Sequence, residues 1–418
     1  MVSFLRSIIA PVSSLFIMIM GNGLLITLIP LRSRYEGFST ELAGYLMASY
    51  YAGLVLGALN INKLIEGVGH IRAFSAFASI FTVLTMLQGV FVNPAAWLVL
   101  RFLSGLCISG VFVTIESWLL VKSTSKTRGK ALSIYMAANY ASQALGQLFL
   151  DVTNPKTIIP FCLVVVLSSL AVVPLSLTRT RAPIIEEPSI LKLKTLLRLS
   201  PLGVVGSFLG GMILGSIFGL LPIYAQELNY SVANIASIMG VTIFGGLCFQ
   251  WPVGAISDRI DRRKVLFCAS LLTLACSFSI AVVNTVNITT FLALSFIFGG
   301  LSFVLYPLAV SHASDLVDPK DLVAMTGGML LSYGIGAIIG PILVTYPMKY
   351  VGPQGFFYFI SSVCLVLALF TLSRIKTKTP VPKEDKLPHA NITRTTPLAS
   401  ELDPRAENVE EKKESTKV

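Results

Sequence analysis

The strongest constraint on the fold of this chain is a series of twelve runs of apolar residues, each about long enough to cross a bilayer. A membrane-spanning helix needs roughly 20 mostly apolar residues. Hydrophobic residues make up 54% of the chain and charged residues only 13%, which is far below the charged fraction of a soluble domain. We therefore predict an all-α membrane protein with twelve transmembrane helices. The runs lie at roughly 8–30, 40–61, 73–92, 95–121, 130–150, 158–178, 201–223, 234–256, 265–284, 288–312, 323–345 and 355–373.

The longest polar interruption between runs, residues 179–200, divides the spans six and six. This organisation predicts an N-terminal six-helix bundle over residues 1–178, a cytoplasmic inter-bundle loop over 179–200 and a C-terminal six-helix bundle over 201–373. Residues 374–418 have no apolar face, and they are basic first and acidic later. Such a composition predicts a disordered cytoplasmic tail.

The orientation follows from Lys and Arg, because basic residues are enriched in the loops on the cytoplasmic side of a membrane. With the N-terminus inside, 27 of the 32 Lys and Arg residues fall on the cytoplasmic side and 4 on the outer side. The bias persists when the tail is left out. Both termini are therefore predicted to be cytoplasmic.

A charged segment from Gly254 to Lys264 separates the eighth and ninth runs. Its basic side chains are too costly to leave in lipid, so they mark a water-facing cytoplasmic edge. Asp258 can pair with a basic group or a helix N-terminus of the other bundle, and such contacts would hold the cytoplasmic side shut until they break. A loop that only anchors topology is the alternative.

This segment resembles a loop signature of the major facilitator superfamily, although Asp261 replaces its second Gly. The loop 62–72 resembles the same signature in degraded form, and a plain cytoplasmic turn is its alternative reading. The resemblance implies two pseudo-symmetric bundles around a cavity that opens alternately to each side, lined by helices one, four, seven and ten. The predicted cytoplasmic gate residues are Glu66, Gly69, Arg72, Arg128, Gly254, Asp258, Arg259, Arg262 and Arg263.

The fourth span contains Arg101, which is followed four residues later by Gly105. An Arg inside a span costs about 2.5–3.5 kcal/mol on insertion scales, so it normally faces protein or water. The pair resembles the fourth-helix signature of the superfamily, which is linked to proton coupling in many members. An Arg that reaches the outer surface is the alternative.

Short sequence motifs in both halves resemble those of the YcaD-type bacterial branch of the superfamily. They include residues 115–118, 128–136 and 322–325. This resemblance implies a multi-pass protein of the bacterial inner membrane and names no substrate. Gly340-Pro341 in the eleventh span resembles a Gly-Pro motif that is found in the fifth helix of antiporters. Because the position differs, antiport is left open.

Three amide side chains in the fifth span, Asn139, Gln143 and Gln147, lie at four-residue spacing and share one helix face. Amides in lipid need partners, so this face is predicted to point into the bundle or a wet cavity. Asn22, near the middle of the first span, has the same interpretation. These four residues are our candidate cavity residues, and joining helices is their alternative role.

Glu116 is the first candidate for a proton-carrying residue, because it lies near the inner end of the fourth span on the same helix face as Arg101. A carboxylate there loses water when the inner side closes and would then bind a proton more readily. His312, near the inner end of the tenth span, is the second candidate, because imidazole titrates near neutral pH. A Glu116 that lies in the headgroup layer and pairs with Lys122 or Arg128 is the alternative.

Several kinds of functional site leave no trace in the sequence. There is no Gly-rich nucleotide loop, no metal-ligating spacing of His, Cys and carboxylates, and no recognisable nucleophile–base pair. We therefore predict that the chain is no enzyme and holds no metal or other cofactor. The net positive charge of the chain does not imply nucleic-acid binding, because basic residues in cytoplasmic loops account for it.

The function predicted is secondary active transport of a small organic solute, coupled to protons and directed outward, by a monomer in the lipid bilayer. Facilitated diffusion or uptake without proton coupling is one alternative. A membrane sensor or scaffold that kept the fold without transporting is another.

Overall fold

The computed structural model describes residues 2–124, 127–178, 191, 193–282, 287–318, 321–377 and 395–402. Within these residues all regular secondary structure is helical. The N-terminal half contains α1 (Val2–Tyr35), α2 (Thr40–Asn60), α3 (Asn62–Val68), α4 (His70–Val90), α5 (Pro94–Lys122), α6 (Arg128–Asp151), α7 (Ile159–Leu170) and α8 (Val172–Ser176). The rest contains α9 (Leu193–Leu199), α10 (Pro201–Glu227), α11 (Val232–Arg259), α12 (Arg262–Val282), α13 (Ile288–Ser314), α14 (Leu322–Leu343), α15 (Thr345–Val351), α16 (Gly355–Thr377) and the 3-10 helix η3 (Pro397–Leu402).

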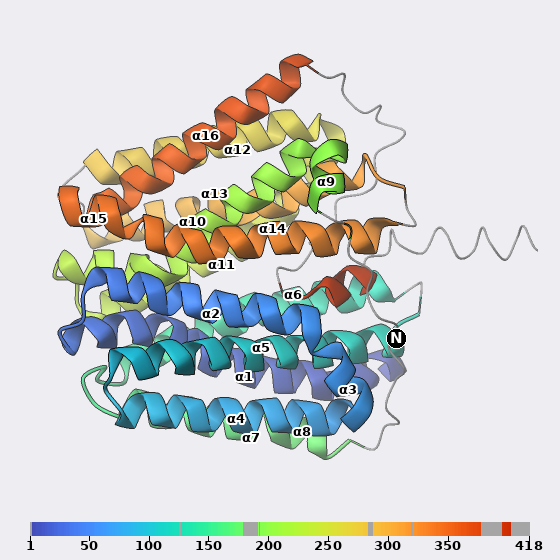
Figure 1. Ribbon diagram of the computed structural model, residues 1–418, viewed down its shortest axis with the longest axis vertical. Coiled ribbons are helices and arrows are strands. Elements are labelled where there is room, and N and C mark those ends of the chain that lie inside the picture. The colour runs from blue at the N-terminus through green and yellow to red at the C-terminus, as the bar shows by residue number, and fades with distance from the viewer. Residues whose placement is uncertain are drawn as a thin grey trace, which may run out of the picture.

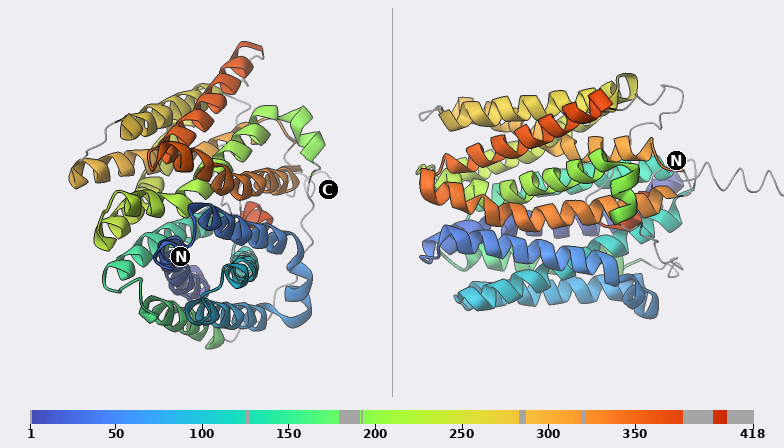
Figure 2. Two further views of the ribbon diagram at one scale, coloured as in Figure 1. Left: turned by 60° about the vertical axis from the view of Figure 1, so that its left-hand side comes forward. Right: turned by 45° about the horizontal axis from the view of Figure 1, so that its top comes forward.

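The long helices run roughly side by side in two bundles, one from each half of the chain (Figure 1; Figure 2). In the N-terminal bundle α2 packs on α5, α1 on α6 and α4 on α7. In the C-terminal bundle α11 packs on α13, α10 on α14 and α12 on α16. Each half thus joins its second long helix to its fourth, its first to its fifth and its third to its sixth. The predicted pseudo-symmetry of two helical bundles is confirmed.

Glycines set the closest approach in one helix pair of each bundle. A Cβ atom at Gly53 or Gly105 would collide with a backbone carbonyl across the α2–α5 pair, and one at Gly245 or Gly299 would do so across the α11–α13 pair. Gly53 and Gly245 are each the fourteenth residue of their helix, and Gly105 and Gly299 are each the twelfth. Small residues allow this backbone contact between apolar helices. The two halves therefore use the same packing device at equivalent positions.

Eleven helices in the described part of the chain are long and apolar enough to cross a membrane, one fewer than the twelve expected. The remaining run, predicted at 130–150, is α6, which is 24 residues long but carries polar side chains. It packs against α1 of its own bundle and α11 of the other. Because this helix lies between the bundles, its polar face meets protein and the cavity rather than lipid, which explains its weak apolar signal.

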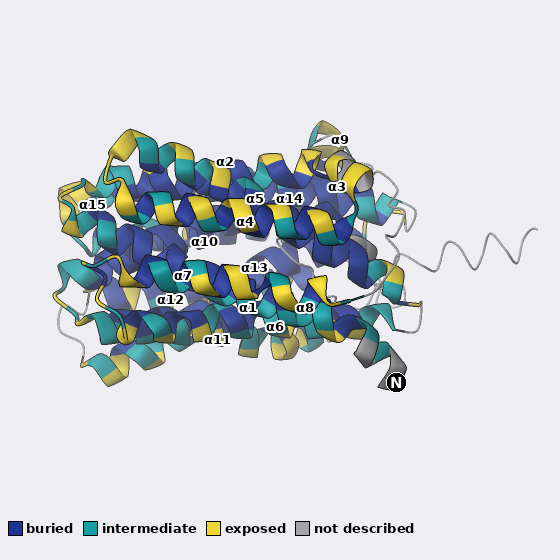
Figure 3. Ribbon diagram, turned by 90° about the horizontal axis from the view of Figure 1, so that it is seen from below, coloured by how far each residue is buried: buried dark blue, intermediate teal, exposed yellow. Residues whose placement is uncertain are grey.

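Apolar side chains line the outside of the molecule. On α4 the side chains of Ile80, Val83 and Met86 are exposed and recur every third residue, and Figure 3 shows exposed residues along this helix. Single exposed apolar residues are ordinary in any protein, but a face of them along a whole helix suits contact with hydrocarbon.

The segment predicted as an inter-bundle loop, 179–200, contains the short helix α9 in its described part. Leu196 on α9 is fully buried, and its side chain lies where a Cβ atom on Gly328 of α14 would be. α9 also packs on α10. Seven residues give too little apolar periodicity to predict such a helix from sequence.

The tail differs from its prediction in the part that the structure describes. α16 continues to Thr377, past the expected start of the tail at residue 374. Thr395–Leu402 is packed against α5, α6 and α14 and contains η3, although the sequence predicts disorder there. The prediction of disorder rests on the local composition of the tail. The structure of this segment depends instead on its burial between the two bundles. The other residues of the tail lie outside the described ones.

Candidate functional site

Following the charge-based orientation, we call the end of the bundles nearest the N-terminus the inner end and the opposite end, near α15, the outer end (Figure 1). A cavity between the bundles encloses about 650 Å³ of empty space, part of it open to solvent. Its walls come from α1, α2, α5 and α6 on one side and from α10, α13 and α14 on the other. All four helices that the family resemblance implies are included. The space between the helices of a bundle is a common place for a small-molecule site.

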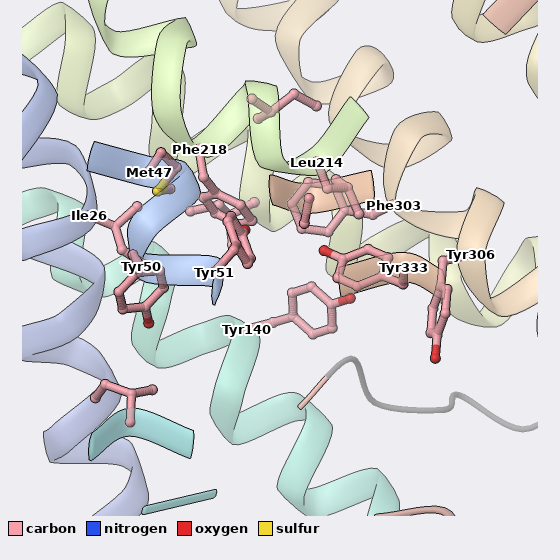
Figure 4. Packing of buried hydrophobic residues seen from close by; sticks show 14 of the residues in the cluster. Ile26, Met47, Tyr50, Tyr51, Tyr140, Leu214, Phe218, Phe303, Tyr306 and Tyr333 are labelled. Carbon is pink, nitrogen blue, oxygen red and sulfur yellow. The ribbon is translucent and has the colours of Figure 1, made fainter. Parts of the chain in front are cut away.

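Aromatic rings dominate the wall of this cavity. The ring centroid of Phe303 lies 5.8 Å from that of Tyr140 and 5.9 Å from that of Phe218, so the rings form a contact chain across the bundle interface. Figure 4 shows Tyr140 and Tyr333 reaching into the space between the bundles from opposite sides. The lining rings are Tyr50, Tyr51, Phe112, Tyr140, Phe218, Phe303 and Tyr333.

Three of the four predicted cavity amides line the cavity, and the fourth joins two helices. Asn22 Nδ2 donates to the Tyr50 hydroxyl at 3.1 Å, and Gln143 Nε2 donates to Asn139 Oδ1 at 2.8 Å. Gln147 Nε2 instead donates to a backbone carbonyl of α1 at 2.9 Å. None of the described residues that line the cavity carries a formal charge.

Arg101 lies directly behind the cavity wall. Its side chain is 1% exposed, and its guanidinium carbon lies 4.3 Å from the ring centroid of Tyr50, which lines the cavity. None of its side-chain nitrogens has a hydrogen-bond partner among the described residues. The cation–π contact offsets only part of the cost of burying this charge. Arg101 therefore does not reach the surface, and its donors remain available within the bundle.

Glu116 lies on α5 and is fully buried. The Tyr135 hydroxyl of α6 donates to its Oε1 at 2.5 Å, and the hydroxyls of Thr395 and Thr396 donate to its two carboxylate oxygens. Among the described residues Glu116 has no ion-pair partner, so it does not form the headgroup-layer pair considered as the alternative. The backbone of Ala399 also hydrogen-bonds to this carboxylate. A carboxyl group held by hydrogen bonds rather than by a cation can gain or lose a proton without breaking an ion pair.

Ion pairs join the two bundles at the outer end. Lys349 Nζ lies 2.7 Å from Glu41 Oε1, and Arg34 lies 3.6 Å from Glu227, which also accepts from the Thr40 hydroxyl. These contacts connect α1 and α2 to α10 and α15. The sequence analysis missed these acids. A signal for them was present in the sequence. Few basic residues lie on the outer side, and several of these have acidic residues at neighbouring helix ends.

The outer end is thus closed by direct contact between the bundles, while the inner end is filled by Thr395–Leu402 from the tail. The profile of the Major Facilitator Superfamily matches residues 12–282 and 204–405 of this chain. The chain belongs to the Major Facilitator Superfamily.

Relatives within this superfamily span nearly the whole chain. The uncharacterized MFS-type transporter YcaD of Escherichia coli O7:K1 is 30% identical over 387 residues, which are 91% of this chain and 99% of that protein. The YcaD protein of Escherichia fergusonii is 29% identical over 386 residues, 90% and 98% of the two chains. The predicted resemblance to the YcaD-type branch is confirmed.

Solved structures share the fold. The nucleoside transporter NupG superposes with a TM-score of 0.75 at 14% identity, over 88% of this chain and 99% of that one. A bacterial homologue of the lysosomal transporter Spinster, in an inward-facing and occupied conformation, superposes with a TM-score of 0.70 at 12% identity, over 91% and 97%. At these identities the likeness shows the major facilitator fold alone.

Arg262 anchors the superfamily loop signature within the C-terminal bundle. Its Nε donates to Asp315 Oδ2 at 2.7 Å, its NH2 group lies 3.2 Å from Asp258 Oδ1, and its NH1 group donates to the Ser257 hydroxyl at 3.1 Å. Arg262 is buried, so one of the predicted gate residues forms part of the bundle core. Gly254, also buried, accepts at its carbonyl from Ser257 at 2.8 Å.

Asp261, which replaces a Gly of the superfamily signature, forms a local charge cluster. Arg263 donates to its carboxylate from Nε and from NH2, the latter at 2.7 Å, and also from the backbone at 3.0 Å. Burial alone would raise the pKa of Asp261, but these bonds from Arg263 outweigh it and hold the pKa below its ordinary value. His312 is half-buried, lies near enough to Asp261 to lower that pKa, and does not line the central cavity.

The remaining predicted gate residues lie around the inner rim. Gly69 joins α3 to α4 with a φ of 84°, which side-chain-bearing residues rarely adopt. Arg72 and Arg259 are exposed, and Arg128 is half-buried. Glu66 lies on α3, and its side chain is outside the described part of the structure. Their role in gating stays a prediction.

Proposed function

We propose that this chain is a secondary active transporter that moves a small organic solute through the central cavity by alternating access. The observation that carries the proposal is a cavity walled by both bundles, closed at the outer end by ion pairs between them. If one bundle rocks against the other, these pairs break and the same cavity opens outward. The chain would act as a monomer in the bacterial inner membrane, with both termini in the cytoplasm.

The chemistry of the wall favours a planar cargo that carries hydrogen-bonding groups and no net charge. Aromatic rings stack on planar solutes, and the amides of Asn22, Asn139 and Gln143 can bond to polar groups on the edge of such a solute. Because none of the described side chains that line the cavity is charged, an ionic cargo would be desolvated without compensation. A nucleoside, the cargo of the nucleoside transporter NupG, has this chemistry.

Proton coupling through Glu116 is the second part of the proposal. Glu116 is buried near the inner end and is held by hydroxyls rather than by a cation. It can therefore cycle between protonated and ionised forms as the inner end closes and opens. Proton entry would then drive export of the cargo, with the unpartnered Arg101 donors available to the coupled state.

Counterflow in proteoliposomes tests the cargo class. Vesicles preloaded with unlabelled uridine, adenosine or nicotinamide should accumulate the matching radiolabelled compound, whereas glucose and lactate should not exchange. Exchange of the charged or aliphatic probes with none of the planar ones would refute the inference from the aromatic wall. Absence of counterflow for every solute in a broad screen would favour a non-transporting sensor or scaffold.

A pH gradient tests the coupling. Export of a transported probe should accelerate when protons can run inward, and Glu116→Gln should abolish that acceleration while leaving counterflow intact. Asp151→Asn, which alters an exposed carboxyl at the outer end of α6, is the matched control. If Glu116→Gln keeps the parent rate and pH dependence, Glu116 is structural and transport is either uncoupled or coupled elsewhere.

A further inference from the structure

The tail segment Thr395–Leu402 lies between the bundles at the inner end. It contacts α5 and α6 of one bundle and α14 of the other, and Figure 1 shows it in red between α6 and α14. Leu398 and Leu402 are 1% and 0% exposed, as buried as residues of the bundle core. Because the segment is joined to α16 only through the tail, this burial is a docking of one part of the chain into a groove formed by the rest.

The polar end of the segment docks on Glu116. Thr395 and Thr396 donate their hydroxyls to the two oxygens of this buried carboxylate, and Thr395 Oγ1 also lies 3.2 Å from the Tyr135 hydroxyl. Thr395 in addition lines the central cavity. The segment therefore makes two kinds of contact. Its apolar side chains are buried in the groove, and its hydroxyl groups donate to Glu116, the buried acid to which we assign proton coupling.

The segment also lies beside α2. A second, small cavity is lined by Thr395 and Pro397 together with residues of α2 and α14, among them Ala58. The groove that holds the segment is therefore bordered by helices of both bundles.

We propose that Thr395–Leu402 is a tethered inhibitory ligand that occupies the inner mouth of the transport pathway and blocks access to Glu116 from the cytoplasm. This rests on the proposed function in that transport is the activity inhibited. Tethering gives a docked segment an effective concentration in the millimolar range, so even a weak site is occupied much of the time. If the groove closes when the bundles rock to the outward-open state, docking also favours the inward-open state.

Cross-linking tests the docking without any cargo. In a chain whose six native cysteines have been replaced, Pro397→Cys paired with Ala58→Cys should be joined by a short bismaleimide in membranes. Pro397→Cys paired with Val83→Cys, on the exposed face of α4, should not. Failure of the first pair to cross-link, or equal cross-linking of both pairs, would overturn the proposal.

Labelling of the inner mouth tests the hydroxyl contacts. Met136→Cys, in the wall of the central cavity, should react with a maleimide added from the cytoplasmic side at least about tenfold faster in the Thr395→Val/Thr396→Val chain, because each hydrogen bond to a charged group shifts an equilibrium by about that factor. Thr395→Ser/Thr396→Ser keeps the hydroxyls and should label at nearly the parent rate.

Equal labelling rates in all three chains would show that the Thr hydroxyls do not hold the tail on Glu116, and the proposal would be wrong. Both readouts are independent of transport. A chain that docks its tail but moves no solute would therefore refute the proposed function, whereas a chain that transports without docking would refute only the tethered ligand.

Discussion

Removing the charge of Asp315 should destabilise the C-terminal bundle far more than removing that of Asp258, although both acids pair with Arg262. The Arg262–Asp315 pair is 2.7 Å long, and its side chains are 1% and 2% exposed. The Arg262–Asp258 pair is 3.2 Å long, and the Asp258 side chain is 37% exposed. The perturbations are Asp315→Asn and Asp258→Asn, which keep shape and remove charge.

The magnitudes follow from burial. Removing one partner of a buried ion pair typically costs about 3–5 kcal/mol, because the other charge stays buried without compensation. Asn keeps an acceptor for Arg262, and Asp258 remains 3.2 Å from its NH2 group, so we expect the lower value, about 3 kcal/mol, for Asp315→Asn. Exposed pairs contribute about 0–1 kcal/mol, so Asp258→Asn should cost less than that. For a bundle of this size each kcal/mol lowers Tm by about 2–4 °C, which gives about 6–12 °C for Asp315→Asn.

Thermal unfolding in detergent, followed by the height of the size-exclusion peak, measures these shifts. The matched rescue is Arg262→Met/Asp315→Leu, which replaces the pair by apolar side chains. Such replacement is often neutral, so the double substitution should recover most of the lost Tm. Equal shifts for Asp315→Asn and Asp258→Asn, or a double variant no better than Asp315→Asn, would refute the reasoning.

Three further outcomes are expected. Lys349→Glu places two acids together at the outer end and should raise labelling of cavity cysteines from outside, and the charge swap with Glu41→Lys should restore the parent rate. Gly53→Leu should abolish the folded peak in size exclusion, because its side chain would collide with a carbonyl of α5, whereas Gly67→Leu faces open space and should fold normally. The depressed pKa of Asp261 means that its stabilising contribution is present above the ordinary value of 3.8 and lost as the pH falls through the lower folded value. Asp261→Asn should therefore lower Tm at pH 7, and its difference from the parent should shrink as the pH is taken further below 3.8.

The helices and their division into halves could be predicted from sequence, because apolar runs of span length are a local signal. The weakest case is informative: α6, predicted as the span 130–150, carries Asn139, Gln143 and Gln147 on a face that lies between the bundles, and it is not among the eleven described helices that are apolar enough to cross a membrane. The same three amides correctly marked α6 as a helix that turns a polar face inward.

The contacts that close and fill the two ends could not be predicted, because their partners are far apart in sequence. Glu41 and Lys349 meet only when the two bundles come together. Glu116 could be recognised as a charge inside a span, but nothing in the sequence around it shows that Thr395 and Thr396 would be its partners. Loop signatures marked Arg262 as basic and inner, and only the packing of α12 on α13 shows it to be buried.

The glycine contacts within each bundle have a mechanical consequence. Because Gly53 and Gly245 have no Cβ atom, the backbones of each helix pair come into direct contact and the two helices can pack as one unit. If each bundle moves as a unit, the change of state takes place at the boundary between the two bundles. A single spectroscopic distance across each mouth, from α2 to α14 at the outer end and from α5 to α14 at the inner end, should therefore follow its entire working cycle.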